Sequence, residues 1–130
     1  MPRLALILVA IHALVLLAHD AAHRDLAVHL NTWQTIFAYS VIVVAPVLAV
    51  AAVFTRYAQL GFGLLAASMF GVLVFGVYHH YILVSPDHVA HLPAGDSQSL
   101  FRATAAAMSV LEFAGVGLGV WGWRKASPKP

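Results

Sequence analysis

The sequence predicts an all-α fold: an integral membrane four-helix bundle of two antiparallel transmembrane hairpins, in a single transmembrane domain over residues 1–130. The chain is 62% hydrophobic and 9% charged, whereas a soluble domain carries about 25% charged residues. A soluble chain of 130 residues could not bury so much apolar surface, so a bilayer must cover it. Four apolar stretches are long enough to cross that bilayer, and basic residues favour one end of them.

The spans are expected at about 4–22, 33–54, 60–84 and 101–123, with a frayed tail over 124–130. The first has the outline of a secretory signal after Arg3, but His12 interrupts its apolar run, so we expect it to be retained. Pro46 removes one backbone hydrogen bond from the second span and predicts a kink. Gly115 and Gly119 form a small-xxx-small pair that favours close helix packing or a homodimer contact.

The basic residues predict the orientation of the bundle. One side carries Arg3, Arg56, Arg124, Lys125 and Lys129. The other side carries Arg24 and Arg102 among several aspartates. The positive-inside rule therefore places both termini in the cytoplasm of a multi-pass protein of the cell membrane. The two longer, histidine-bearing loops then face the extracytoplasmic side.

Seven of the eight histidines fall in two stretches, at positions 19–29 and 79–91, near the same predicted membrane surface. On the first span, His12, His19 and His23 form a narrow stripe at 100° per residue. An unpaired polar ring facing lipid is costly, so this stripe should face the bundle interior. On the third span, only one of His79 and His80 should face the bundle, since consecutive side chains point about 100° apart.

Counting the helical rise, at ~1.5 Å per residue, places His23 and His79 at a similar level, roughly 30 Å above the inner ends of their helices. The run Ser85-Pro86-Asp87 predicts the start of a short helix. That helix would hold His88 and His91 on one face, just above the mouth of the bundle.

Imidazoles and carboxylates are thus expected to converge at one surface as a metal site: His19, His23, His79, His80, His88, His91, Asp20 and Asp87. This chemistry suits a transition metal such as Cu, Zn or Fe. Two facing imidazoles can instead hold a b-type haem, with Gly71, Gly76 and residues 105–107 lining its slot. The chain has no cysteine, so such a haem would be non-covalent. Histidines that only mark the membrane interface are the alternative.

Glu112 is the one acid inside an apolar span, and His12 lies at a similar depth in the first span. An ionisable residue at this depth suggests function by default. We expect a hydrogen bond between these two side chains. Such a buried polar pair either passes protons or only locks two helices together, and Glu112 contacting another subunit is a further alternative.

Three classes of function fit these observations. The first is a small membrane protein that binds a transition metal or b-type haem at its extracytoplasmic face, for metal handling or electron transfer. The second is a non-catalytic accessory subunit of a larger membrane complex. The third is a proton-coupled transporter or a metal-dependent membrane enzyme, although the chain has neither an inverted repeat nor a Ser-His-Asp arrangement.

No catalytic residue can therefore be named, and the sequence favours a protein that is not an enzyme. The formal charge of +2 is small and scattered, which argues against nucleic acid as a partner. The expected partners are the lipid bilayer and either other membrane subunits or a second copy of the chain.

Overall fold

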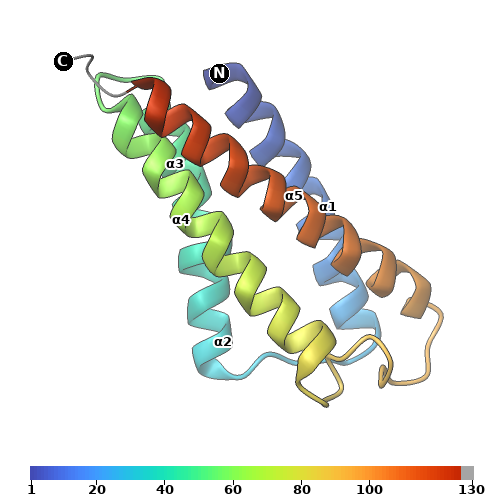
Figure 1. The fold of residues 1–130 in the computed structure, drawn as a ribbon. Helices are drawn as coiled ribbons and strands as arrows, with labels where there is room; N and C mark the ends of the chain where they lie inside the picture. Colours follow the sequence, from blue (N-terminus) through green and yellow to red (C-terminus); the bar gives the residue numbers. More distant parts are fainter. Residues whose placement is uncertain (127–130) are drawn as a thin grey trace.

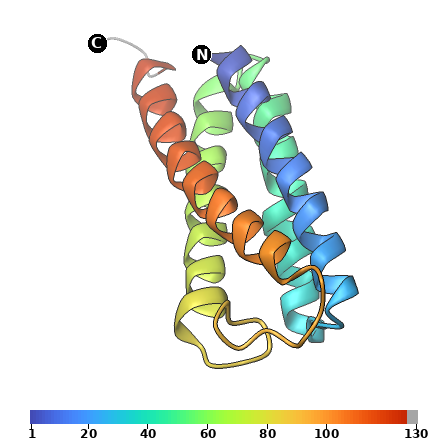
Figure 2. The ribbon, with the colours of Figure 1, turned by 90° about the vertical axis from the view of Figure 1, so that its right-hand side faces the viewer.

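The computed structural model describes residues 1–126, which form four long helical segments, with no strand among them. The first is α1 (Pro2–Asp25) and the last is α5 (Gln98–Ala126). Between them lie two segments that combine α-helical and π-helical parts, Thr32–Val53 and Ala58–Ile82. Each segment is long and apolar enough to cross a membrane. The N-terminus and the end of α5 lie at the same end of the bundle (Figures 1 and 2). The expected all-α four-helix bundle is confirmed.

The first and last helices extend beyond the apolar runs that predicted them, whereas the second and third end one and two residues early, at Val53 and Ile82. The first helix reaches Asp25, three residues past the expected end, and α5 begins at Gln98, three residues before the expected start. At its other end α5 continues to Ala126, so residues 124–126 are helical and not frayed. Arg124 and Lys125 explain this, because both are good helix formers and their charge suits a helix C-terminus. The rest of the expected tail, 127–130, lies outside the described residues.

The second segment, Thr32–Val53, changes helix type just before Pro46. It consists of α2 (Thr32–Phe37), the π-helical η1 (Ala38–Val44) and α3 (Ala45–Val53). The backbone N–H of Ala45 bonds to the carbonyl of Ser40, five residues back. A proline has no N–H to donate and its ring crowds the preceding turn. The disturbance expected at Pro46 therefore takes the form of a wider turn.

At the end of the bundle that holds the N-terminus, small residues let the helices pack closely. A Cβ atom added at Gly119 would lie 2.6 Å from the backbone nitrogen of Ala66, and one at Gly115 would lie 2.7 Å from Cγ of Met69. The glycine pair of α5 thus packs against α4 (Ala58–Val77) within the chain. The apolar core of this end consists of Ala5, Val9, Ala49, Val50, Val53, Phe62, Leu65 and Met69.

At the opposite end, the loops 26–31 and 83–97 close the bundle (Figure 2). A second apolar core lies there, formed by Ala22, Leu26, Val28, Leu92 and Phe101. Residues 85–91 form turns and bends, so the prediction of a short helix after Ser85 is wrong. Single turns close from His88 to Ser85 and from His91 to His88, whereas the N–H of Val89 bonds to the carbonyl of His80 at 3.0 Å. This bond folds the loop back onto η2 (Tyr78–Ile82), the π-helical end of the third segment.

Candidate metal centre

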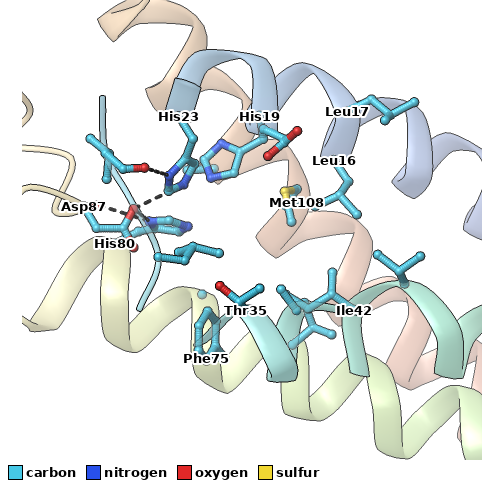
Figure 3. Close-up of a pocket in the computed structure, with 18 of the residues that line it drawn as sticks. Leu16, Leu17, His19, His23, Thr35, Ile42, Phe75, His80, Asp87 and Met108 are labelled. Carbon is cyan, nitrogen blue, oxygen red and sulfur yellow. Dashed lines mark hydrogen bonds and ion pairs between the residues drawn. The ribbon is translucent and has the colours of Figure 1, made fainter. Parts of the chain in front are cut away.

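Three histidines from two helical segments meet inside the loop end of the bundle. His19 and His23 lie one turn apart on α1, and His80 lies on η2. One ligand atom from each lies within 4.8 Å of the others. Figure 3 shows the three rings turned toward one another and toward Asp87. We call this group the three-histidine site.

Asp87 completes the group from the loop. Its Oδ1 atom lies 3.3 Å from Nε2 of His23 and 3.3 Å from Nδ1 of His80. The loop holds the carboxylate in place, because the carbonyl of Asp87 accepts a hydrogen bond from Nδ1 of His80 at 3.1 Å. The side chain of Asp87 is buried, so the carboxylate belongs to the interior of the site and not to the surface.

The partners of Nδ1 assign the same protonation to all three rings. Nδ1 of His23 faces the carbonyl of Val28 at 3.1 Å, and a carbonyl can only accept. Nδ1 of His80 faces the carbonyl of Asp87 in the same way. Nδ1 of His19 lies 2.8 Å from the hydroxyl of Thr104. That hydroxyl already donates to the carbonyl of Leu100 at 2.7 Å, so it accepts from His19. Each neutral ring therefore carries its proton on Nδ1 and its lone pair on Nε2.

This arrangement brings buried acceptor atoms together, with a donor supplied only by a long contact from Nδ1 of His80, 3.3 Å from Oδ1 of Asp87. Nε2 of His19 and Oδ1 of Asp87 are buried and have no hydrogen-bond partner among the described residues. Nε2 of His23, also a lone pair, points at the same carboxylate oxygen. A buried unpaired acceptor costs about 1–3 kcal/mol. A cation between these atoms would satisfy all of them at once. Metal-binding histidines characteristically donate their other N–H to a carbonyl or hydroxyl, as these three do.

Hydrogen bonds separate the remaining expected ligands from the site. His79 is buried as well as His80, so the expectation that only one of the pair faces the bundle is wrong. His79 points away from the site toward α2, where its Nδ1 atom accepts from the side-chain amide of Gln34 at 3.3 Å. Gln34 is held in that orientation because its Oε1 accepts from the backbone N–H of Asn31. Nδ1 of His88 likewise accepts, from the N–H of Ala90 at 3.1 Å. In both rings the Nδ1 lone pair is in use, the reverse of the three-histidine site.

The other two expected ligands lie at the surface. The ring of His91 contacts that of His88, with centroids 4.9 Å apart, and neither ring reaches the site. Asp20 forms an ion pair with Arg24 on the outer face of α1, and 52% of its side chain is exposed. The structure thus brings together four of the eight expected ligands: His19, His23, His80 and Asp87.

Phe101 backs the site from the loop side. Its ring centroid lies 4.5 Å from that of His19, 4.8 Å from that of His23 and 5.4 Å from that of His80. Together with the second apolar core, this ring excludes water from the loop end of the site. No motif or spacing in the sequence singled out Phe101 or Thr104. Their position on the first turns of α5, level with the histidines, is the one signal that could have found them.

The environment of Asp87 keeps its carboxyl group ionised. Burial alone would raise the pKa of Asp87. The nearby N–H of His80 and the attraction of the imidazoles of His80, His23 and His19 outweigh burial, so the pKa is lowered from its usual value of 3.8. At neutral pH the site therefore contains one buried negative charge beside three imidazoles.

A second polar pair lies deeper in the bundle. Nε2 of His12 lies 3.5 Å from Oε1 of Glu112, and both side chains are almost completely buried. The structure places the two residues side by side, at the depth that counting residues predicted. Oε2 of Glu112 has no hydrogen-bond partner among the described residues.

No protein-family model, curated protein or solved structure matches this chain. Its chemistry therefore has to be argued from its own residues.

Proposed function

We propose that this chain is a multi-pass membrane protein that binds one divalent transition metal ion for metal handling. The ligands are Nε2 of His19, Nε2 of His23 and Nε2 of His80, with the carboxylate of Asp87 as the fourth. The observation that carries the proposal is the common protonation of the three rings, whose Nδ1 atoms all face acceptors while buried lone pairs meet a carboxylate.

The exterior of the helices supports insertion in a bilayer. Large apolar side chains are exposed along the four segments, as Leu14, Val47, Phe70 and Phe113 illustrate. Aromatic residues are exposed near both ends of the bundle, as interfacial belts require: Trp33, Tyr78, Tyr81, Trp121 and Trp123. The positive-inside rule then orients the metal site toward the extracytoplasmic side.

The ligand set favours a borderline ion such as Zn²⁺ or Cu²⁺. Three imidazoles and one carboxylate are typical ligands for these ions, and Zn²⁺ prefers four ligands in a tetrahedron. A haem requires two imidazoles that face each other across a porphyrin. Here His19 instead lies edge-on to both His23 and His80, with ring centroids 4.8 and 4.9 Å apart. This contact supports a single small ion over a haem, and electron transfer stays a prediction.

The test compares two neighbouring histidines. The protein is purified in detergent, freed of metal with a chelator, and titrated with Zn²⁺ by calorimetry. We expect one ion per chain. The His80→Ala variant should bind at least about 100-fold more weakly, since removing even an outer partner of a ligand costs 10–100-fold. The His79→Ala variant is the matched control and should bind as tightly as the wild type.

Asp87→Asn serves where His80→Ala does not fold, as judged by its helical circular dichroism, and should also weaken binding. Two results contradict the proposal. One is the absence of stoichiometric binding by the wild type, which transfers support to the accessory-subunit alternative. The other is an equal loss of affinity in the two histidine variants, which would show that the ion sits elsewhere.

A further inference from the structure

A cavity of about 530 Å³ extends from the three-histidine site into the middle of the bundle. It lies between α1 on one side and the second and third segments on the other, with α5 at its back. Figure 3 shows Leu16, Ile42, Phe75 and Met108 lining it away from the histidines. Its volume falls in the range of small-molecule sites, about 300–1,000 Å³, and its walls are mainly apolar, as such sites require.

Glu112 contributes the polar group farthest from the loops. Only 1% of its surface is exposed, and it lines the cavity. One carboxyl oxygen, Oε1, faces His12. The other, Oε2, is buried without a hydrogen-bond partner among the described residues. A buried polar atom in an apolar wall is costly unless something bonds to it. The cavity therefore has a specific point at which a ligand would be stabilised.

The absence of a side chain at Gly76 leaves space beside Oε2 of Glu112. A Cβ atom built on Gly76 would lie 3.8 Å from Oε2 of Glu112 and 3.9 Å from Cδ2 of His80. Both distances are ordinary van der Waals contacts, so no side chain fills the position between Glu112 and His80. A larger side chain at Gly76 would project into this part of the cavity.

The chemistry of the walls and of this single oxygen restricts the ligand. A hydroxyl group both donates and accepts, so it satisfies the carboxyl group whether Glu112 is ionised or protonated. An ammonium group carries three donors, whereas Oε2 is the one unpartnered oxygen at this depth among the described residues. The cavity reaches the outer surface beside the exposed Asp20 and Arg24, and also beside Leu17, Tyr39 and Val43, which are exposed on the apolar exterior. A ligand would thus have access from an apolar medium.

We propose that this cavity binds a lipid-soluble alcohol or phenol, whose hydroxyl group bonds to Oε2 of Glu112 and whose apolar body packs against α1 and η1. The inference does not rest on the metal site. It is tested on the full chain in the presence of a chelator, so that a failure of metal binding leaves the result unaffected.

The probes are 4-hexylphenol and its methyl ether, 4-hexylanisole, which has the same apolar body but no hydroxyl donor. Binding to the full chain in nanodiscs is measured by equilibrium dialysis, and protein-free nanodiscs correct for partition into lipid. We expect saturable binding of the phenol, about tenfold tighter than that of the ether, as one hydrogen bond to a buried carboxyl group allows. Equal affinities would overturn the proposal and identify the cavity as space for an acyl chain.

Two variants locate the binding. Glu112→Met keeps the length of the side chain but removes its polar atoms, so the preference for the phenol should disappear. Gly76→Leu fills the cavity and should abolish saturable binding of both probes. Gly117→Leu is its matched control, because nothing lies within 4 Å of a Cβ atom there, and it should bind as the wild type does. A phenol preference that survives Glu112→Met, or binding that survives Gly76→Leu, contradicts the assignment. If Glu112→Met does not fold, the Gly76→Leu variant still tests whether the probes bind in this cavity.

Discussion

The two ends of the bundle are built on opposite principles. At the end that holds the N-terminus, α5 packs so closely on α4 that Gly119 has no room for a methyl group beside Ala66. Every buried residue of the core cluster there is apolar. At the loop end, buried imidazoles and a carboxylate lie beside a smaller apolar core, and a cavity separates α1 from the second segment. The first end is built for stability, and the second has unused hydrogen-bonding capacity.

The loop end also contains the irregular backbone. The π-helical segments η1 and η2 both border the cavity. Ala27, just after α1, adopts a φ of 52°, in the left-handed region that costs a residue with a Cβ atom roughly 1–2 kcal/mol. The turn at Ala27 brings the carbonyl of Val28 to Nδ1 of His23. Strained or unusual backbone that persists in a structure tends to mark functional sites, and here it positions the partners of the ligands.

The largest effect on stability should come from a substitution at the tightly packed end. Replacing Gly119 with Ala puts a Cβ atom 2.6 Å from the backbone of Ala66, so α5 and α4 must move apart. We expect a loss of about 3 kcal/mol in the free energy of unfolding, the upper range for overpacking. Thermal unfolding in detergent, followed by circular dichroism, measures it. The same substitution at Gly117, where a Cβ atom meets nothing within 4 Å, should have little effect or stabilise. Equal losses at both positions would mean that the two faces of α5 do not differ.

The next effect belongs to the loop end and is measured as a loss of metal affinity. Thr104→Val keeps the shape of the side chain but removes the acceptor for Nδ1 of His19. Loss of such a partner lowers metal affinity by about 10–100-fold. Ser109→Ala removes another hydroxyl of α5, one that bonds to the carbonyl of Ala105, and should leave Zn²⁺ affinity unchanged. Restoration of affinity by Thr104→Ser would show that the hydroxyl acts through His19. An affinity that does not change in Thr104→Val would contradict the assigned protonation of His19.

The contrast between the two ends also explains what the sequence could predict. Apolar length alone placed the four helices to within a few residues. The i, i+4 spacing of His19 and His23 placed both on one face of α1, and counting residues set His12 level with Glu112. These inferences hold because helix geometry is regular over long distances.

The orientation of the ligand side chains and the path of the loop depend on local hydrogen bonds. The periodicity of the sequence does not predict such bonds. The 100° separation of His79 and His80 implied that only one faces the bundle, but both side chains are buried, on different sides of their helix. The bond from Gln34 holds His79 against the second segment, and the bond to the carbonyl of Asp87 holds His80 in the three-histidine site. The loop after η2 could not be predicted as turns, because the bond from Val89 to His80 joins it to another element and interrupts the helix expected after Ser85.

The smallest expected effect is on the free energy of unfolding at different pH values, and it comes from the carboxyl group of Asp87. The pKa of Asp87 is lowered from 3.8, so the folded protein releases this proton more readily than the unfolded chain does. The stabilisation is complete well above pH 3.8 and is lost as the pH falls through the lowered pKa. In metal-free protein, Asp87→Asn should therefore be less stable than the wild type by about 1 kcal/mol at pH 6, the usual net contribution of a hydrogen bond. The difference should vanish in strong acid.

Unfolding midpoints of the two proteins between pH 2 and pH 7 measure this difference. Both chains carry the same histidines, so subtracting the two curves isolates the carboxyl group of Asp87. Asp96→Asn, at an exposed position of the same loop, is the control and should parallel the wild type throughout. A gap between Asp87→Asn and the wild type that is constant down to pH 2 would show that the ionised carboxylate contributes no stability to the loop end. The imidazoles would then lack the anionic partner that makes a buried cation favourable there.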